Sequence, residues 1–540
     1  MTKQVAIIGA GCSGLGAIKC CLEEGLEPTC FEKSDDLGGL WRYTEMVEEG
    51  RASIYSSVVT NTSKEMMCFS DFPMPDDFPA YLHNSKVLQY LRLYAEHHQL
   101  LKYIQFKTEV CCVTKHPDFA NTGQWEIVTE KDGRHKKKTT FDAVLVGNGH
   151  FFKPYLPLDS FPGIEKFKGQ YIHSRFYKKS QDYHKKIVLV VGIGNSAGDI
   201  SSEISGTAKQ VYLSTRQGSW VLSRVSQQGF PLDMMFSTRF HFWITNALSD
   251  GVRAKMIEKQ MNGWFNHANY GLQPKDRSTL KEPIVNDFLP SNILCGAVRV
   301  KPSIKAFTET SVIFEDGTVV EDLDAVIFAT GYSVCFPFLD DSIVNVNEDN
   351  KVTLYKYVFP PHLEKPTLAF LGVLQPFGGV IPVVELQSRW ATKIFKGAAC
   401  LPPVSKMEDY IKKSEQLRAK NFTKCRNQSL QAQYVEYMDE VAMEIGVRPN
   451  IMRFLLTDPK LACKVFFGPC TPYQYRLTGP GKWNGARKAI LTQWNRTLNP
   501  SRTRVVYNSQ ESNFKSHLGY LSLVAAIFIC LFCIALSLLL

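Results

Sequence analysis

Residues 5–32, VAIIGAGCSGLGAIKCCLEEGLEPTCFE, decide the fold of this chain. The apolar run at residues 5–8 is typical of a buried parallel strand, and residues 29–31 predict a second one. Between them lies a glycine-rich turn, followed by a predicted helix over residues 13–22. A strand, a turn, a helix and a strand in this order predict an α/β domain with a doubly wound parallel sheet.

Three glycines and one acid give this turn its chemistry. Gly9, Gly11 and Gly14 have GxGxxG spacing. The first allows a tight turn, the second lets a pyrophosphate approach the backbone, and the third lets the helix pack close to the strand. Glu32 follows the second strand, where a carboxylate accepts hydrogen bonds from a ribose diol. The stretch therefore predicts a dinucleotide site; a chance glycine turn is the alternative.

A further glycine pair, Gly38-Gly39, comes shortly after Glu32 and precedes Leu40-Trp41. It offers a second point at which a cofactor can approach the backbone. A flavin adenine dinucleotide reaches further than a nicotinamide dinucleotide needs to reach. The pair therefore favours FAD at the first site.

The fingerprint occurs a second time. Residues 187–191 predict a buried strand, a helix extends through residue 204, and residues 210–214 predict the next strand. Thr215-Arg216 stands where the first unit has its acid, and a hydroxyl with a cation suits the 2′-phosphate of NADPH. A solvated surface Arg216 is the alternative. The turn itself contains Gly192, Ile193, Gly194, Asn195, Ser196 and Ala197, the last of which still permits close helix packing.

The chain has 540 residues, a formal net charge of +10, 44% apolar and 21% charged residues. This composition is typical of a globular protein, and the length predicts two or three domains. The densest basic run, residues 134–138, predicts a solvated hairpin loop and not a nucleic-acid site, because no aromatic residues are interleaved with it. The 15 cysteines include adjacent pairs in apolar runs, which is typical of reduced, buried thiols.

The C-terminal residues differ from the rest. Residues 518–540 contain no Asp, Glu, Lys or Arg and are long enough to cross a bilayer. Since no chain follows them, we expect a tail anchor in the endoplasmic reticulum membrane, with the catalytic part facing the cytosol. Arg502, Arg504 and Lys515 agree with the positive-inside tendency. A buried core helix is the alternative.

Residues 220–300 are rich in aromatic side chains and interrupt the α/β pattern. We expect an inserted helical subdomain with its own core; a surface that contacts lipid or lines a substrate channel is also open. The predicted fold class is α/β with two Rossmann-like domains, this insertion and a transmembrane tail. The expected division is 1–154 (FAD domain, first part), 155–330 (NADP domain), 331–445 (FAD domain, second part), 446–517 (C-terminal region and linker) and 518–540 (anchor).

Two further motifs give a specific resemblance. Phe167, Gly169, His173 and Tyr177 have the spacing FxGxxxHxxxY, and residues 328–332 read FATGY. Together with both fingerprints, these motifs resemble the flavin-containing monooxygenases, most closely the mammalian microsomal, dimethylaniline N-oxide-forming type. The resemblance extends from residue 2 to the C-terminal anchor.

The resemblance implies a reaction cycle. NADPH reduces FAD, the reduced flavin and O2 form a C4a-hydroperoxyflavin, and soft nucleophilic amines and sulfides, among them xenobiotics, become N-oxides or S-oxides. NADP+ stays bound and shields the peroxide from water. The sequence suggests no hydrolytic triad, no paired carboxylates and no metal site, and the cofactor would supply the difficult chemistry.

The resemblance also assigns residues. Asn61 matches the active-site asparagine, beside the flavin and the nicotinamide ribose. We expect His173 to be structural, with contact to NADP as the alternative. Including the fingerprints, the expected cofactor-binding residues are Gly9, Ala10, Gly11, Cys12, Ser13, Gly14, Glu32, Gly38, Gly39, Leu40, Trp41, Thr60, Asn61, Thr62, Gly192, Gly194, Asn195, Ser196, Ala197, Gly198, Thr215 and Arg216.

Three alternatives stay open. A Baeyer–Villiger oxygenase, which acts on ketones, shares the cofactors. A thiol–disulfide reductase shares the layout but needs a redox cysteine pair near the flavin, for which Cys20-Cys21 is poorly placed. A non-catalytic, tail-anchored flavoprotein would have no reason to keep both fingerprints. The sequence leaves the substrate and the formation of a homo-oligomer open.

Overall fold

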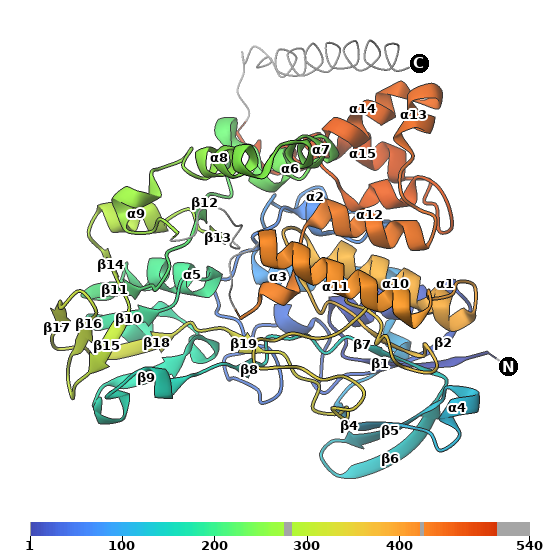
Figure 1. Cartoon of the computed structure of the whole chain (residues 1–540), viewed down its shortest axis with the longest axis horizontal. Coiled ribbons are helices and arrows are strands. Elements are labelled where there is room, and N and C mark those ends of the chain that lie inside the picture. The colour runs from blue at the N-terminus through green and yellow to red at the C-terminus, as the bar shows by residue number, and fades with distance from the viewer. Residues whose placement is uncertain (1, 275–282, 422–425, 505–540) are drawn as a thin grey trace.

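Two parallel five-stranded sheets form the two halves of the described chain, as the computed structural model shows (Figure 1). The structure describes residues 2–274, 283–421 and 426–504. Helices lie over both sheets, and in Figure 1 a further group of helices lies above the first half. The predicted α/β class is confirmed by this architecture.

The first sheet has the strand order β20-β7-β1-β2-β3. Helix α1 (Cys12–Glu23) joins β1 to β2, as the sequence predicts. Val5 and Ile7 pack in the core that contains α1, whereas Ala6 and Ile8 pack against the opposite layer. This alternation buries both faces, which explains the continuous apolar run. The strands are β1 (Gln4–Ile8), β2 (Glu27–Phe31), β3 (Ile104–Gln105), β7 (Ala143–Val146) and β20 (Leu368–Phe370).

The second sheet, of order β14-β11-β10-β18-β9, repeats this design. Val188 and Val190 pack in the core with α5 (Asn195–Ile204), while Leu189 and Val191 pack on the other face. The second predicted strand–turn–helix–strand unit is therefore confirmed. Its strands are β9 (Gln170–His173), β10 (Ile187–Val191), β11 (Gln210–Ser214), β14 (Val298–Lys301) and β18 (Ala325–Phe328).

Two short strands lie where the chain passes between the halves. β8 (Lys153–Pro154) lies on the outward path and β19 (Tyr332–Ser333) on the return path, and the two pair antiparallel. After the return, β20 joins the edge of the first sheet beside β7. The sheet is thus completed by a strand that lies far away in the sequence.

Antiparallel strands cover the outer face of each half. The expected loop at residues 134–138 is corrected here: Asp132 and Gly133, both with positive φ, form the turn, and most of the basic run lies in exposed strand β6. Residues 135–138 are all exposed, so this end of the strand is in contact with water and can hold a basic run. These strands are β4 (Thr108–Lys115), β5 (Trp125–Lys131), β6 (His135–Phe141), β15 (Ile304–Phe307), β16 (Val312–Phe314) and β17 (Val319–Val320).

Residues 220–300 are partly helical, but their buried side chains join the cores of the two halves. Met234 packs in the core of the first half, whereas Leu272 and Ile284 pack in that of the second. The expected separate core is therefore wrong, because the apolar residues of this region face its neighbours. The elements are β12 (Val221–Leu222), α6 (Leu232–Phe236), α7 (Arg239–Ala247), α8 (Asp250–Met261), β13 (Ile284–Val285) and α9 (Leu289–Leu294).

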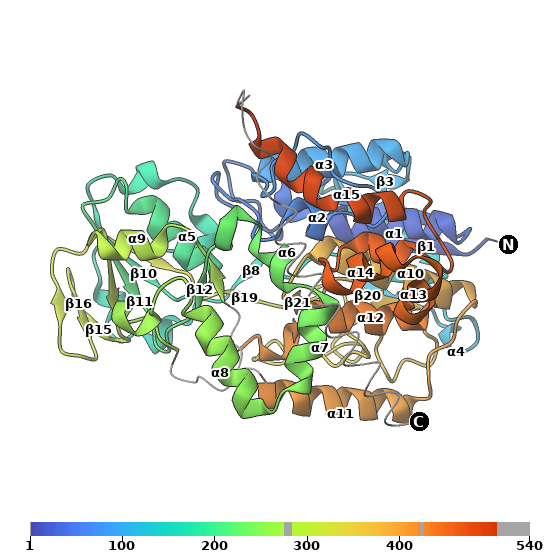
Figure 2. The ribbon, with the colours of Figure 1, turned by 90° about the horizontal axis from the view of Figure 1, so that it is seen from above.

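The remaining helices lie in the half of the molecule that contains the first sheet, on the right in Figure 2. Among the described residues no helix is both long and apolar enough to cross a membrane, and the predicted anchor at residues 518–540 lies outside them. The described cysteines are free thiols. The helices are α2 (Lys64–Met67), α3 (Asn84–His97), α4 (Phe119–Thr122), α10 (Val380–Lys396), α11 (Val404–Asn421), α12 (Tyr434–Glu444), α13 (Ile451–Thr457), α14 (Pro459–Phe467) and α15 (Ala486–Leu498).

Candidate functional site

A cavity of about 2730 Å³ lies at the carboxyl ends of strands from both sheets. Gly9 and Glu32 follow β1 and β2, while Gly194 and Ala329 follow β10 and β18, and all four residues line it. Ligands of open α/β sheets bind at this edge. The cavity therefore joins the two predicted nucleotide sites.

The first glycine turn is closed around its own backbone. A Cβ atom on Gly14 would lie 1.9 Å from the carbonyl oxygen of Gly9, and Gly9 itself has φ +96°. Gly11 faces Gly39 across a narrow gap, because a Cβ on Gly39 would lie 3.1 Å from the Cα of Gly11. Any larger side chain at these positions would fill the gap. Because both residues are glycines, the backbone can approach a bound pyrophosphate, as the dinucleotide prediction requires.

The carboxylate of Glu32 is buried and ties the turn to the end of β2. Its Oε2 accepts a hydrogen bond from the N–H of Ala10 at 2.7 Å, and its Oε1 accepts from the N–H and hydroxyl of Ser34 at 2.9 and 2.7 Å. A carboxylate has further lone pairs, and Glu32 also lines the cavity. These residues fit an adenine dinucleotide whose ribose hydroxyls reach this acid.

The structure brings most of the predicted first-site residues together. Ala10 and Gly14 are outside the cavity lining and act inside the turn, through the bond to Glu32 and through close packing. The residues that line the cavity are Gly9, Gly11, Cys12, Ser13, Glu32, Gly38, Gly39, Leu40, Trp41, Thr60, Asn61 and Thr62.

The second turn is more open. A Cβ on Gly192 would lie 2.5 Å from the carbonyl oxygen of Ala329, but a Cβ on Gly194 would meet no atom within 4 Å. Gly194, Asn195 and Ser196 line the cavity. Open space beside Gly194 leaves room for a phosphate group against the N-terminus of α5.

Five predicted residues of the second site lie outside the cavity lining: Gly192, Ala197, Gly198, Thr215 and Arg216. Ala197 is a buried residue of α5 itself. Thr215 is buried and accepts a hydrogen bond from the N–H of Gly218 at 3.0 Å, whereas Arg216 is exposed after β11. The role of Arg216 towards a 2′-phosphate therefore stays a prediction.

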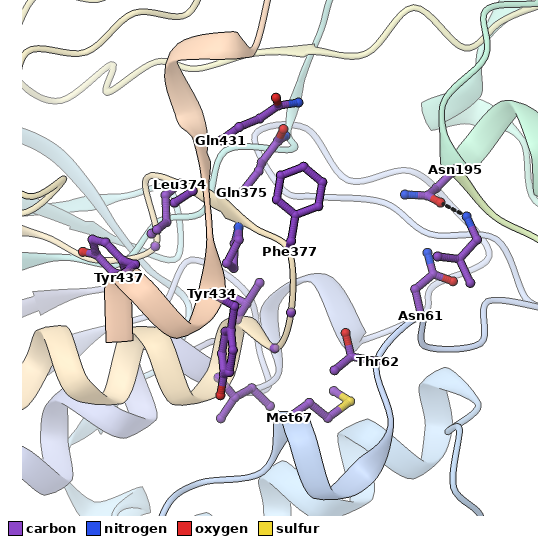
Figure 3. A pocket seen from close by; sticks show the side chains of 18 of the residues that line it. Asn61, Thr62, Met67, Asn195, Leu374, Gln375, Phe377, Gln431, Tyr434 and Tyr437 are labelled. Atoms are coloured by element: carbon purple, nitrogen blue, oxygen red, sulfur yellow. Dashed lines mark hydrogen bonds between the residues drawn. The ribbon is translucent and has the colours of Figure 1, made fainter. Parts of the chain in front are cut away.

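Asn61 lines the same cavity as residues of the two turns. Its Oδ1 accepts a hydrogen bond from Nη2 of Arg224 at 2.7 Å. Figure 3 shows Asn61 beside Asn195, whose Oδ1 accepts from the N–H of Val285 at 2.9 Å. Across the space from them in Figure 3 lie Phe377, Gln375, Gln431 and Tyr434.

Two acids at the cavity wall are paired with neutral groups. Asp199 accepts hydrogen bonds from the Tyr55 hydroxyl at 2.6 Å and from the amide of Asn286 at 2.8 Å. Asp233 accepts from the N–H and hydroxyl of Ser63. Burial raises the pKa of both carboxyls, because desolvation disfavours their charged forms.

His173 has a structural environment. Its Nδ1 accepts from the N–H of Arg175 at 3.1 Å, and its Nε2 lies 2.9 Å from the carbonyl oxygen of Gly331, on the return path between the halves. Burial lowers its pKa to about 4, so the imidazole is neutral and Nε2–H donates. The expected structural role agrees with this geometry.

Sequence reasoning missed several cavity residues. Arg224 lies in the aromatic-rich region and carries no motif, while Gln375, Gln431 and Tyr434 come from the C-terminal third of the chain. The side-chain oxygens of the two glutamines and the Tyr434 hydroxyl are buried without a protein partner in the described structure. Residue spacing gives no signal for them, since only long-range packing brings them to the cavity.

Comparisons with known proteins show the family of this chain. The flavin-binding monooxygenase-like family matches residues 2–536. The chain is 57% identical to dimethylaniline monooxygenase (N-oxide-forming) 2 of Cavia porcellus, over 97% of this chain and 98% of that protein. It is 55% identical to flavin-containing monooxygenase 2 of Homo sapiens, over 98% of this chain and 99% of that protein.

Among solved structures, S-allyl-L-cysteine S-oxygenase from Allium sativum is similar, with a TM-score of 0.64 and 25% identity over 92% of this chain and 99% of that one. The likeness extends over nearly the whole length, and both glycine turns open into one cavity. The chain therefore belongs to the family of flavin-binding monooxygenases and is a flavin-containing monooxygenase that uses FAD and NADPH.

Proposed function

We propose that this enzyme oxygenates soft nitrogen and sulfur nucleophiles in small molecules, with FAD along the first glycine turn and NADPH along the second. The observation that carries the proposal is the continuity of the cavity between Glu32 and Asn195. A hydride donor and an acceptor bound to the two turns would meet near Asn61. The domain division expected from the sequence is part of this proposal.

Bound FAD supplies the electron transfer and the oxygen activation that protein side chains lack. The residues of the chain bind and orient the cofactors and the substrate, and they exclude water from the site. Met67, Leu374 and Phe377 give the cavity apolar walls, which suit an uncharged amine or thioether and keep water away from the reacting atoms. Asn61 supplies a polar amide among them.

The relatives support this substrate class. The Cavia porcellus protein is named as an N-oxide-forming dimethylaniline monooxygenase, and the Allium sativum protein as an S-oxygenase of S-allyl-L-cysteine. Nitrogen and sulfur each offer a lone pair to an electrophilic oxygen, so one site serves both.

A substrate panel tests the proposal. The full-length, FAD-loaded protein is given NADPH, air and matched tertiary amines, thioethers and ketones, and products are identified by mass spectrometry. We expect N-oxides and S-oxides. Esters from ketones as the main products would favour the Baeyer–Villiger alternative, and retained FAD that NADPH fails to reduce would overturn the oxygenase assignment.

We also propose that residues 518–540 anchor the enzyme in the endoplasmic reticulum membrane, with the catalytic part in the cytosol. The uncharged segment supports this, as do exposed apolar side chains on α7 and α13, Trp243, Met452 and Leu456. Ile529→Arg should release the protein from alkali-washed membranes, because a central arginine opposes insertion by about 3 kcal/mol. Equal membrane retention of the variant would contradict the anchor. The control Lys515→Gln should leave retention unchanged.

A further inference from the structure

Arg224 follows β12 and is buried in the wall of the cavity. Its Nη2 donates to Oδ1 of Asn61 at 2.7 Å, and its Nε donates to the carbonyl oxygen of Thr60 at 3.0 Å. One guanidinium group thus holds two successive residues, Thr60 and Asn61, that line the cavity shared by the two glycine turns. We propose that Arg224 is a positioning residue that fixes the orientation of the Asn61 amide.

The orientation follows from the chemistry of the two groups. A guanidinium carries only hydrogen-bond donors, so the Asn61 atom that faces it is the oxygen. The amide nitrogen, with its two N–H bonds, is then left for partners in the cavity. Asn61 consequently acts as a donor towards bound groups, and rotation of the amide would break a charge-assisted hydrogen bond.

Arg224 is itself held by Asp287. Its Nη1 lies 2.9 Å from Oδ2 of Asp287, and its own N–H donates to Oδ1 at 2.8 Å. The hydroxyl of Tyr81 donates to the carbonyl oxygen of Arg224 at 2.7 Å. The bond from Nη1 to Asp287 restrains the guanidinium, and the other two contacts hold the main chain of Arg224. A chain of bonds therefore runs from Asp287 through Arg224 to Asn61.

The inference rests on the role proposed for Asn61, and a double-mutant cycle tests both. The full-length, FAD-loaded wild type is compared with Arg224→Ala, Asn61→Ala and the double variant. Two quantities are measured: oxygenated product formed per NADPH consumed, and the dissociation constant of NADP+ by calorimetry. A misplaced group of this kind lowers productive turnover on the order of tenfold or more.

If Arg224 acts through Asn61, the double variant is no worse than Asn61→Ala alone in either measurement. Arg224→Lys, which keeps a donor-only cation, should restore part of the product yield. Two outcomes would overturn the inference and leave the role of Asn61 standing. One is that the losses of the two single variants add up in the double variant. The other is that Arg224→Ala behaves like the wild type while Asn61→Ala is impaired. An unaltered Asn61→Ala would overturn the role of Asn61 and the inference together.

Arg389→Ala is the matched control for damage to folding. Arg389 is also buried and donates from Nη1 to the carbonyl oxygen of Tyr475 at 3.1 Å, but it is not a cavity residue. Its loss should lower the unfolding temperature and leave product per NADPH unchanged. An equal loss of product in Arg389→Ala would show that the effect of Arg224→Ala is general damage, and would overturn the positioning role.

Discussion

The carboxylate of Glu32 lies 2.7 Å from the backbone nitrogen of Ala10, so the acid at the end of β2 is bonded to the glycine turn at the end of β1. The same carboxylate also accepts two bonds from Ser34. Glu32 therefore holds the shape of the turn as well as offering oxygens to a ribose. A substitution of Glu32 would remove both functions together, because one carboxylate performs both.

Glu32→Ala should therefore weaken FAD binding by more than the loss of one contact to the ribose would. Hydrogen bonds to a charged group are each worth about 1.5–3 kcal/mol, so we expect the dissociation constant for FAD to rise by about tenfold or more. The FAD-to-protein ratio after purification and fluorescence titration measure this. Glu27→Ala, at the exposed start of β2, is the control and should keep FAD. Full flavin retention by Glu32→Ala would contradict the assignment.

A second prediction concerns the stability of the protein at low pH. His267 is fully buried, with Nδ1 2.9 Å from Oδ1 of Asn262 and Nε2 accepting from the N–H of Val221 at 2.9 Å. Burial lowers its pKa to about 4, against about 6.5 in an unfolded chain. Between these values the unfolded state binds the extra proton, so stability is lost as the pH falls from about 6.5 towards 4.

Unfolding temperatures at pH 7, 6 and 5 measure this loss. His267→Gln should reduce the slope of the free energy of unfolding against pH by up to about 1.4 kcal/mol per pH unit, which is the contribution of one proton. His98, His150 and His173 also have pKa values lowered by burial to about 4, so part of the slope should persist. A steeper slope in His267→Gln would refute the explanation.

The sequence was sufficient to predict both strand–turn–helix–strand units because their signals are local. Gly9, Gly14 and Gly192 are required by contacts with backbone nearby in space, and the GxGxxG pattern reports that requirement directly. The apolar strands are readable because both of their faces are buried. The site at the first turn follows from the same short stretch.

The rest of the site depends on contacts between distant segments. Arg224 reaches Asn61 across 163 positions of sequence, and nothing in the residues around Arg224 indicates it. The aromatic residues at 220–300 predicted a separate core, but apolar character does not reveal which neighbour a side chain packs against. Gln375 and Gln431 lie opposite each other in the paired strands β21 (Gln375–Pro376) and β22 (Gln431–Ala432), a pairing without a local signal.

A third prediction separates packing from binding at the second turn. Gly194 has φ −100°, which any residue adopts, and a Cβ there would meet no protein atom. Gly194→Ala should therefore fold with an unchanged unfolding temperature. If the backbone approaches the pyrophosphate at this point, the methyl group should raise the dissociation constant of NADPH by about tenfold or more, with FAD content unchanged.

Calorimetric titration with NADPH measures the effect of Gly194→Ala. Gly14→Ala is the contrasting variant, because its Cβ would lie 1.9 Å from the carbonyl oxygen of Gly9 and must disturb the fold itself. Unaltered NADPH affinity in Gly194→Ala would place the pyrophosphate elsewhere.

The last prediction concerns the choice between the two nicotinamide cofactors. Arg216 is exposed two residues after the end of β11, close to the place where the first unit has Glu32 after β2. A cation at this position would form charge-assisted hydrogen bonds with the 2′-phosphate of NADPH. Its hydrogen bonds with the 2′-hydroxyl of NADH would be weaker. Arg216→Ala should raise the dissociation constant of NADPH by about ten- to a hundredfold and leave that of NADH nearly unchanged. Lys209→Ala is the control, because it removes a cation just before the start of β11, and it should change neither dissociation constant. If Arg216→Ala weakened the binding of NADPH and NADH equally, the arginine would contact a part of the dinucleotide that both cofactors share.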